Sequence, residues 1–299
     1  MADKLKAELG EVQQTLLIPL YARASATKAG GRLLDDPRAV EMVEAIDFDF
    51  TRFDGAGSLI GANLRTLVLD SWVRDFLAEH PEGTVVEIGC GLNTRLERVD
   101  NGRVHWFDLD LPDAITLRRT FFTDTDRRTM LSASVTDTAW TDAVLRSPAP
   151  HFLVAEAVLP YLSEGEVRQV LAMLAAHFPG ALLATDTTGA GMQRVQESHD
   201  VLGSMTARMQ WICDDPTLPV QWLPSIRHLE SVASHTCRRG HCIGWSQNSV
   251  QPCRRTHSKT PMCRNPRVST ATALADLRPL GLGTPLGRGR LHVNQALFQ

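Results

Sequence analysis

Residues 85–95 read VVEIGCGLNTR, and this stretch decides how the rest of the chain is interpreted. Val85, Val86 and Ile88 form a short β-branched run that ends at Gly89 and Gly91. Such a run is typical of a strand buried on both faces of a parallel sheet. The two glycines predict a tight turn at its carboxyl end, where doubly wound sheets bind their ligands.

Further strands are predicted around this one, at residues 104–110, 129–135, 151–159 and 181–186. Apolar residues between positions 64 and 77 follow helical spacing, and HPEG at 80–83 ends that helix. A second helix opens at Ser163 and Glu166 with a capping box and stops before Pro179-Gly180. Strands alternating with helices predict an α/β, doubly wound and mostly parallel sheet.

The length and composition agree with one elaborated α/β domain. The chain has 299 residues, of which 43% are hydrophobic, so it can bury a full core. Its start, MADKLKAELGEVQQ, is charged, and no apolar run approaches the ~20 residues of a membrane span. We therefore expect a cytoplasmic protein with no membrane partner. The oligomeric state is left open.

The net charge of −3 conceals two unlike parts. Residues 1–231 carry 21 basic and 33 acidic side chains, whereas residues 232–299 carry ten Lys/Arg and one acidic residue, Asp276. That C-terminal part has little periodicity between 233 and 290, although strands at 226–232 and 291–298 fit the pattern. It also holds four of the six cysteines, at 237, 242, 253 and 263, which we expect to be reduced thiols.

The glycine turn lacks the marks of a phosphate site. A dinucleotide fingerprint needs a third glycine where this chain has Thr94, and a G-x-x-x-x-G-K-[ST] loop is absent from the sequence. Asp110 ends the second strand, 21 positions after Gly89, where its carboxylate can accept both hydroxyls of a ribose. A ribose site without a phosphate cradle suits S-adenosylmethionine. The alternative interpretation is a plain strand-to-helix turn and a solvated Asp110.

Four segments resemble the leucine carboxyl methyltransferase family, in order and at the family's spacing. They are TLLIPLYARA (15–24), VVEIGCGLNTR (85–95), VHWFDLDLP (104–112) and LVAEAVLPYL (153–162), and the likeness runs from about Thr15 to Val232. The bacterial branch of tetracenomycin-type polyketide O-methyltransferases is the most similar. The resemblance implies a class I, Rossmann-like methyltransferase core that uses S-adenosylmethionine, with an N-terminal helical cover.

The resemblance also implies roles for single residues. Gly89 and Gly91 match the cofactor loop, and Asp110 matches the family's ribose-binding acid. Arg65 matches an arginine that pairs with the cofactor's carboxylate, a task that suits the two parallel donors of a guanidinium. Arg23 falls where the family places another basic contact.

The remaining implied contacts lie after the third and fourth strands. Glu156 matches a glutamate beside the methionine part of the cofactor. Ser134 and Val135 stand where eukaryotic relatives have an Asp-Leu pair flanking the adenine, which leaves Asp137 or a backbone group as another adenine contact. Taken without the family, the favoured interpretation of Arg65 is a solvated helix residue and that of Glu156 is a helix cap.

The sequence indicates less about the methyl acceptor than about the cofactor. A carboxylate is already ionised and needs no base, whereas a phenol or alcohol would need one, with His105 and His151 as candidates. Both histidines also fit structural positions near strand ends, so no base is assigned. Tyr161 could orient the acceptor or pack in the core. Residues 16–53 and 187–211 are expected to cover the site and exclude water.

Two competing functions are less well supported by the sequence. A nucleic-acid methyltransferase would agree with the basic tail, but the Asn/Asp-Pro-Pro-aromatic turn of base N-methylases is replaced by EAVLPY at 156–161. A zinc site in the tail would need closely paired cysteines, and the spacings here are four, ten and nine residues. We expect a small-molecule acceptor, no nucleic acid and no metal.

Three regions are therefore predicted: a helical cover at 1–82, a methyltransferase core at 83–232, and a basic segment of atypical composition at 233–299. The likeness fades where the composition changes, as a shifted reading frame or a diverged C-terminus would produce. A methyltransferase-fold protein that binds cofactor but turns over poorly is the alternative to an active O-methyltransferase.

Overall fold

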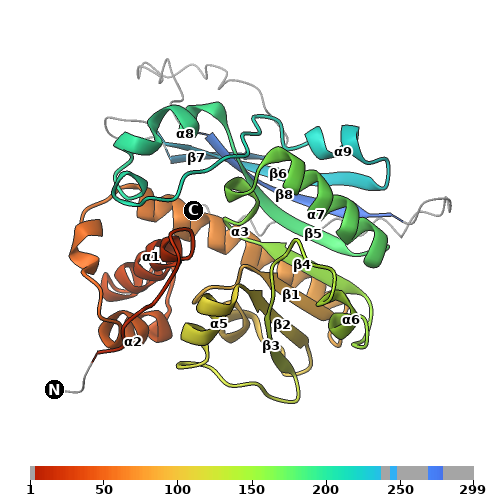
Figure 1. Cartoon of the computed structure of the whole chain (residues 1–299), viewed down its shortest axis with the longest axis horizontal. Coiled ribbons are helices and arrows are strands. Elements are labelled where there is room, and N and C mark those ends of the chain that lie inside the picture. Colours follow the sequence, from red (N-terminus) through yellow and green to blue (C-terminus); the bar gives the residue numbers. More distant parts are fainter. Residues whose placement is uncertain (1–3, 237–242, 248–268, 279–299) are drawn as a thin grey trace.

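The computed structural model describes residues 4–236, 243–247 and 269–278, and one mixed sheet organises them (Figure 1). The described strands form an eight-stranded sheet in the order β3-β2-β1-β4-β5-β8-β6-β7. Their bounds are Thr84–Ile88 for β1, His105–Asp110 for β2, Arg128–Ser132 for β3, His151–Ala155 for β4, Leu182–Thr188 for β5, Ile226–Thr236 for β6, Ile243–Gln247 for β7 and Ser269–Leu277 for β8.

Strands β1 to β5 are parallel, as the alternating pattern predicted. β1 lies between β2 and β4, with Thr84 level with both His105 and His151. The carboxyl ends of these strands therefore meet at one edge of the sheet. β4 is shorter than predicted and ends at Ala155, because Ala157 adopts a left-handed conformation (φ 56°) that turns the chain out of the sheet.

The C-terminal part differs from the prediction. β8, which the sequence analysis missed, lies between β5 and β6 and is antiparallel to both. β6 continues to Thr236 and carries β7 at the edge of the sheet. β6 therefore extends beyond Val232, where the strand was predicted to end. The strand predicted at 291–298 and the four tail cysteines lie outside the described residues.

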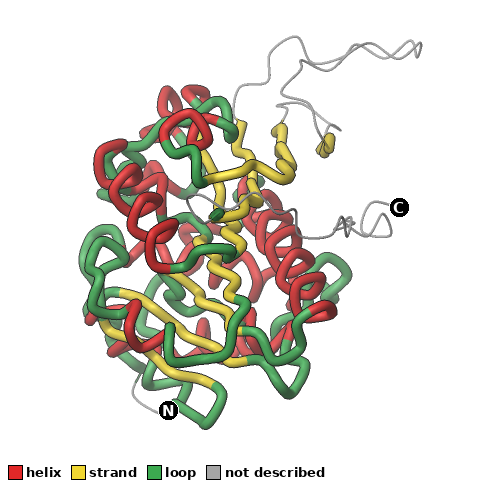
Figure 2. The backbone as a smooth tube through the Cα atoms, turned by 90° about the vertical axis from the view of Figure 1, so that its right-hand side faces the viewer, coloured by secondary structure: helices red, strands yellow, loops and turns green. Residues whose placement is uncertain are grey.

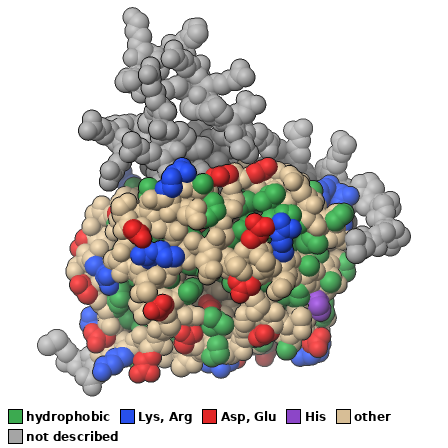
Figure 3. Space-filling view, turned by 45° about the horizontal axis from the view of Figure 1, so that its top comes forward, with side chains coloured by type: hydrophobic (Ala, Val, Ile, Leu, Met, Phe, Trp, Pro, Cys, Tyr) green, Lys and Arg blue, Asp and Glu red, His purple; other side chains and the backbone are tan. Residues whose placement is uncertain are grey.

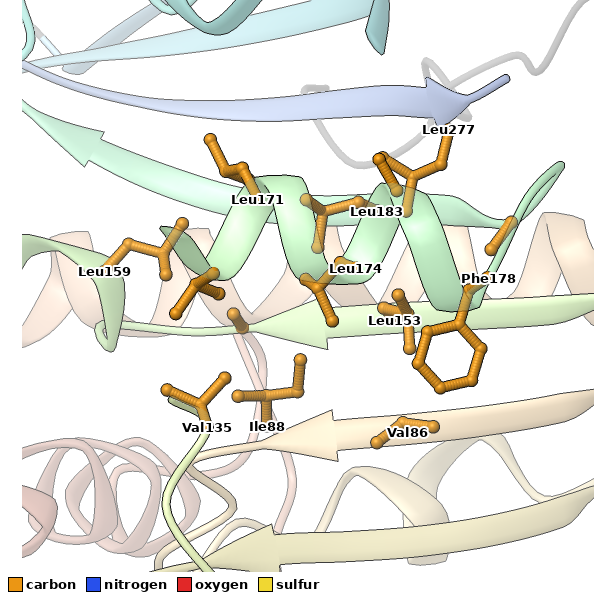
Figure 4. Close-up of a cluster of buried hydrophobic side chains, with 14 of the residues drawn as sticks. Val86, Ile88, Val135, Leu153, Leu159, Leu171, Leu174, Phe178, Leu183 and Leu277 are labelled. Atoms are coloured by element: carbon orange, nitrogen blue, oxygen red, sulfur yellow. The ribbon is translucent and has the colours of Figure 1, made fainter. Parts of the chain in front are cut away.

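Helices cover both faces of the sheet (Figure 2). α3 (Ser58–Glu79) and α4 (Arg95–Val99) pack on the face that carries Val85, Trp106 and Phe152. The other face is covered by α6 (Thr141–Val144), α7 (Glu164–His177) and α9 (Leu218–Trp222). Figure 4 shows the second of these cores, in which Leu171 and Leu174 of α7 belong to one apolar cluster with Val86 and Leu153. The predicted capping box at Ser163 and Glu166 is confirmed.

A third apolar cluster joins the N-terminal helices to the segment after β5. It packs α1 (Leu17–Lys28), α2 (Pro37–Ala45) and η2 (Phe50–Phe53) with α5 (Pro112–Arg118), α8 (Ala190–Val195) and η5 (Leu202–Ser204). Three further short helices, η1 (Gln13–Leu16), η3 (Leu159–Tyr161) and η4 (Gln196–Ser198), complete the described elements. None of the helices among the described residues is both long and apolar enough to span a bilayer.

Candidate functional site

A cavity of about 1160 Å³ opens at the carboxyl ends of the parallel strands. Its lining comes from three parts of the chain: the turns after β1, β2, β3 and β4, the N-terminal cover with the start of α3, and the segment from Thr188 to Met209. The two segments expected to cover the site, 16–53 and 187–211, thus both contribute to its wall.

The structure brings together every residue that the sequence assigned to the cofactor. All of the following line this cavity, with the acceptor-orienting candidate last: Arg23, Arg65, Gly89, Gly91, Asp110, Ser134, Val135, Glu156 and Tyr161. The two candidate bases do not line it. His105 and His151 begin β2 and β4, at the opposite edge of the sheet. Asp137, named with a backbone group as another adenine contact, is also outside the lining.

The glycine turn after β1 needs its glycines for two reasons. Gly89 and Gly91 have φ angles of 63° and 44°, a region that side-chain-bearing residues rarely adopt. A Cβ at Gly89 would overlap the Cγ2 of Val158, and one at Gly91 would lie 3.0 Å from the Cβ of Leu16. The side chains of Val158 and Leu16 therefore pack closely against the turn, and its backbone borders the cavity.

Asp110 presents a carboxylate with spare capacity to accept hydrogen bonds. Its Oδ2 accepts from the backbone N–H of Gly91 at 2.7 Å, and its Oδ1 accepts from that of Leu111 at 2.7 Å. Burial raises the pKa of Asp110, and the two N–H donors oppose this rise. Since each carboxylate oxygen has about two acceptor positions, one per oxygen is left for a ligand with two adjacent hydroxyls.

Arg65 reaches the cavity from α3. Its Nε donates to Glu156 at 3.1 Å and its Nη1 to Asp186 at 3.4 Å, and 17% of the side chain is exposed. Among the described residues, Nη2 has no hydrogen-bond partner. The guanidinium is thus anchored from one side and keeps donor capacity for an anionic group in the cavity.

Glu156 is more heavily engaged than the resemblance implied. One oxygen accepts from Arg65 and from Thr66 (2.8 Å), and the other accepts from Asn93 (3.3 Å) and Arg95 (2.6 Å). Burial alone would raise its pKa, but Arg65 and Arg95 outweigh burial and lower it to about 2. Glu156 therefore stays ionised and holds the two arginines in place, with its acceptor positions filled.

Arg23 also borders the cavity as part of a structural anchor. It is 2% exposed; its Nε donates to Asp36 at 2.8 Å and its Nη2 to the carbonyl of Leu92 at 2.7 Å. Arg23 thereby ties α1 to the glycine turn.

An ion network beneath the cavity was missed by the sequence analysis. Arg95 is 1% exposed and donates to Asp70 (2.8 Å), Glu87 (2.6 Å) and Glu156 (2.6 Å). Burial raises the pKa of Glu87 to about 7, although Arg95 acts against the rise. One signal pointed to the network: Glu87 lies inside an apolar strand, and a buried carboxylate requires a partner.

Other residues of the lining take no part in this network. We call nine of them, from the N-terminal cover, α3, η3 and the segment from Thr188 to Leu202, the acceptor half: Val12, Thr15, Ile60, Tyr161, Thr188, Met192, Val195, His199 and Leu202. Burial raises the pKa of Tyr161, whose hydroxyl bonds to Thr15. Thr188 is fully buried, and its hydroxyl has no partner among the described residues. Val12 and Ile60, 43% and 44% exposed, add apolar surface at the cavity.

Comparison with known proteins places this geometry in a family. A family model described as leucine carboxyl methyltransferase matches residues 17–175. The tetracenomycin polyketide synthesis O-methyltransferase TcmP of Streptomyces glaucescens is 33% identical over 221 residues, which cover 73% of this chain and 82% of that protein. An S-adenosyl-L-methionine-dependent methyltransferase of Gibberella zeae, dpfgK, is 27% identical over 81% of this chain and 89% of its own length.

Solved structures agree at the level of the fold. A Thermobifida fusca protein assigned as a methyltransferase has a TM-score of 0.50 and 14% identity, and the match covers 86% of this chain and 94% of that one. A DUF574 family protein from Streptomyces avermitilis has a TM-score of 0.50 and 16% identity, covering 86% of this chain and 97% of its own. The overall fold of this chain thus occurs in other chains of low sequence identity.

Proposed function

The chain belongs to the leucine carboxyl methyltransferase family and is an S-adenosylmethionine-dependent methyltransferase, and we propose that it methylates an oxygen of a small aromatic or polyketide-like metabolite. Its likeness to TcmP, an O-methyltransferase of tetracenomycin polyketide synthesis by name, supports oxygen as the receiving atom. A carboxyl oxygen is the first choice and a hydroxyl oxygen the second.

The residues present fit the cofactor. Asp110 offers two acceptor positions for a ribose diol, and Arg65 offers a guanidinium for an amino-acid carboxylate. The glycine turn exposes backbone without forming a phosphate cradle, which agrees with a cofactor that has no phosphate. When bound there, S-adenosylmethionine supplies a methyl group on a sulfonium, which an acceptor oxygen displaces in line. The protein's task is then mainly to align the acceptor and exclude water.

One observation carries the proposal: a single cavity joins the charged cofactor residues to a largely apolar acceptor half. Its volume of about 1160 Å³ exceeds the roughly 300–1,000 Å³ of most small-molecule sites, so there is room for a second ligand beside the cofactor. The acceptor half contributes hydroxyl, imidazole and apolar groups, without a lysine or arginine among the residues that define it. Such a surface suits a flat, mostly apolar molecule.

The carboxyl oxygen is preferred because the acceptor half offers no evident base: the Nδ1 of His199 already accepts from two backbone N–H groups. Burial raises the pKa of Tyr161, and it raises the pKa of Cys90 well above the usual thiol range. The carboxylates of Glu11 and Asp200 also border the cavity, but both residues are exposed. A carboxylate acceptor arrives ionised and needs no proton removed, whereas an alcohol would need one.

A small acceptor also agrees with the charge pattern of the surface. On the face shown in Figure 3, basic and acidic side chains of the described residues are interspersed. A phosphate track needs basic side chains gathered along one path. We therefore propose a small-molecule acceptor in preference to a nucleic acid.

The test compares acceptors that share one ring system. Purified protein with S-adenosylmethionine is given 2-naphthoate, 2-naphthol or 2-naphthylamine, and the methylated product and S-adenosylhomocysteine are quantified. We expect methyl ester from the acid at a higher rate than ether from the naphthol. Methylation of the amine alone would overturn oxygen as the receiving atom. Cofactor binding with no transfer to any of a wider panel of acids and phenols would favour the alternative of a catalytically weak binding protein.

A further inference from the structure

His199 is the single histidine among the described residues that line the cavity. It lies between η4 and η5, in the segment after β5 that closes the acceptor half. Its side chain is 13% exposed, so most of the ring is packed while part of it stays accessible. His199 is neither of the two candidate bases expected from the sequence, His105 and His151.

The hydrogen bonds around the ring fix which nitrogen carries the proton. The Nδ1 of His199 lies 3.3 Å from the backbone nitrogens of both Val201 and Leu202, whose N–H groups point at it. A nitrogen that accepts from two N–H donors carries no proton itself, so a neutral ring holds its proton on Nε2. Nδ1 thus satisfies two backbone N–H groups at the start of η5, a contact called the cap on η5 below, and these bonds fix the tautomer.

The neighbouring carboxylate does not change this assignment. Asp200 Oδ1 lies 3.2 Å from Nδ1, but this contact does not have the geometry of a hydrogen bond. The contacts of Nδ1 with the two backbone N–H groups do have that geometry. Asp200 instead accepts from the backbone N–H of Ser58 through Oδ2, at 3.1 Å. Burial lowers the pKa of His199 more than Asp200 raises it, which agrees with a neutral ring.

We propose that His199 is a positioning residue that donates its Nε2–H to one oxygen of an acceptor carboxylate, leaving the other oxygen to take the methyl group. This proposal rests on the proposed O-methyltransferase function. Nε2 has no hydrogen-bond partner among the described residues, so its N–H is available to a ligand. The same arrangement prevents His199 from acting as a base, since one nitrogen is protonated and the lone pair of the other is already used.

Two substitutions test the roles of Nδ1 and Nε2 separately. His199→Asn keeps an acceptor at the position of Nδ1, so the cap on η5 is retained, but it removes the Nε2–H donor. His199→Gln can carry an N–H to the position of Nε2 but loses the cap. A positioning role predicts that the Asn variant is stable but binds the acceptor poorly. It also predicts that the Gln variant is less stable but binds the acceptor better than the Asn variant.

The first experiment measures binding of 2-naphthoate to the full chain loaded with S-adenosylhomocysteine. We expect His199→Asn to weaken this binding about tenfold or more, the usual effect of losing a hydrogen bond to a charged group, and His199→Gln to recover most of it. Unchanged binding in the Asn variant, or better binding by Asn than by Gln, overturns the proposal. So does a wild-type protein that binds S-adenosylhomocysteine but not 2-naphthoate. Failure to bind S-adenosylhomocysteine contradicts the cofactor site itself, which is a different failure.

A second experiment needs no acceptor. The ring-nitrogen resonances of ¹⁵N-histidine-labelled protein are recorded at pH 7, and the signal lost in His199→Asn assigns the residue. We expect the neutral ring protonated on Nε2. A ring protonated on Nδ1, or a doubly protonated ring, overturns the proposal.

Discussion

The two halves of the cavity are built in opposite ways. The cofactor half is charged, and its arginines and carboxylates are buried at the ends of β1 and β4 and on α3 and α4, as in the contacts of Arg95 with Glu87 and Glu156. The acceptor half is made largely by short helices and loops, with Ile60 of α3 and Thr188 at the end of β5, and presents hydroxyls, an imidazole and apolar surface. A charged cofactor is thus held by fixed charges on regular elements, whereas the acceptor is selected by shape and neutral donors.

The largest expected effect tests whether the ion network supports the cofactor half. Arg95→Leu would leave three buried carboxylates without their shared partner, and breaking a buried ion pair in this way costs about 3–5 kcal/mol. We expect a loss of that size in the free energy of unfolding, measured by urea denaturation. Arg103→Leu is the control, because Arg103 pairs with Glu82 at an exposed position. Equal losses of unfolding free energy in both variants would contradict a stabilising role for the buried network.

Acid should remove the stability that ionised Glu156 contributes to the same half. Glu156 has an ordinary pKa of 4.5, and its arginine partners, acting against burial, lower this to about 2 in the folded protein. A lowered pKa adds stability above pH 4.5, on the order of 3 kcal/mol, and this stability is lost as the pH falls from 4.5 towards 2.

Urea denaturation at several pH values checks this expectation. Glu156→Gln should be less stable than wild type at pH 6, and the difference should shrink towards pH 2.5. Thr188→Val, in the acceptor half, removes no titrating group and should leave the pH dependence unchanged. A constant gap between Glu156→Gln and wild type at every pH would contradict the assigned role of Glu156.

Cofactor affinity should depend on one half only. Asp110→Ala removes the carboxylate proposed to hold the ribose, and two hydrogen bonds to a charged group correspond to about a hundredfold in affinity for S-adenosylmethionine. Arg65→Ala should weaken binding by about tenfold or more. Tyr161→Phe should leave the affinity unchanged. Calorimetric titration decides, and comparable weakening by Tyr161→Phe would mean that the two halves are not separate in function.

The contrast between the halves also explains what the sequence could predict. The run at 84–88 and the turn at Gly89 and Gly91 carry local signals, so the strand, the turn and the cofactor site were predicted together. β8 reads STATALADL and has few large apolar residues. It can still be buried, because it lies between β5 and β6. A strand of this kind is defined by its neighbours rather than by its own residues, so its sequence gives little warning.

The missed functional residues have the same explanation. Arg95 gains its role from Asp70 and Glu87, which lie 25 and 8 positions away and meet only in the fold. His199 bonds to N–H groups two and three positions ahead, so its signal is local, but a ring nitrogen capping one helical turn has no short motif. Strand and turn signals carried by neighbouring residues can thus be anticipated, whereas contacts between residues distant in the sequence and the geometry of irregular segments require the structure.

The smallest expected effect concerns the backbone at the junction of the two halves. Ala157 has φ 56°, lines the cavity, and donates its N–H to Asp186 at 2.7 Å. A side-chain-bearing residue in this left-handed conformation costs roughly 1–2 kcal/mol, whereas glycine adopts it freely but loses more entropy on folding. Ala157→Gly should therefore change stability by less than about 1 kcal/mol, in the stabilising direction.

Ala155→Gly is the matched comparison for that variant. Ala155 lies two residues earlier, in the extended conformation of β4, where glycine gains no relief of strain and loses a buried methyl group. It should lower thermal stability while Ala157→Gly raises it slightly, both measured as melting temperatures. If Ala157→Gly instead proved the more destabilising of the two, the methyl group of Ala157 would have to be holding the turn between the halves. The site would then need the methyl group of Ala157 for packing, and this packing would outweigh the strain of its left-handed backbone.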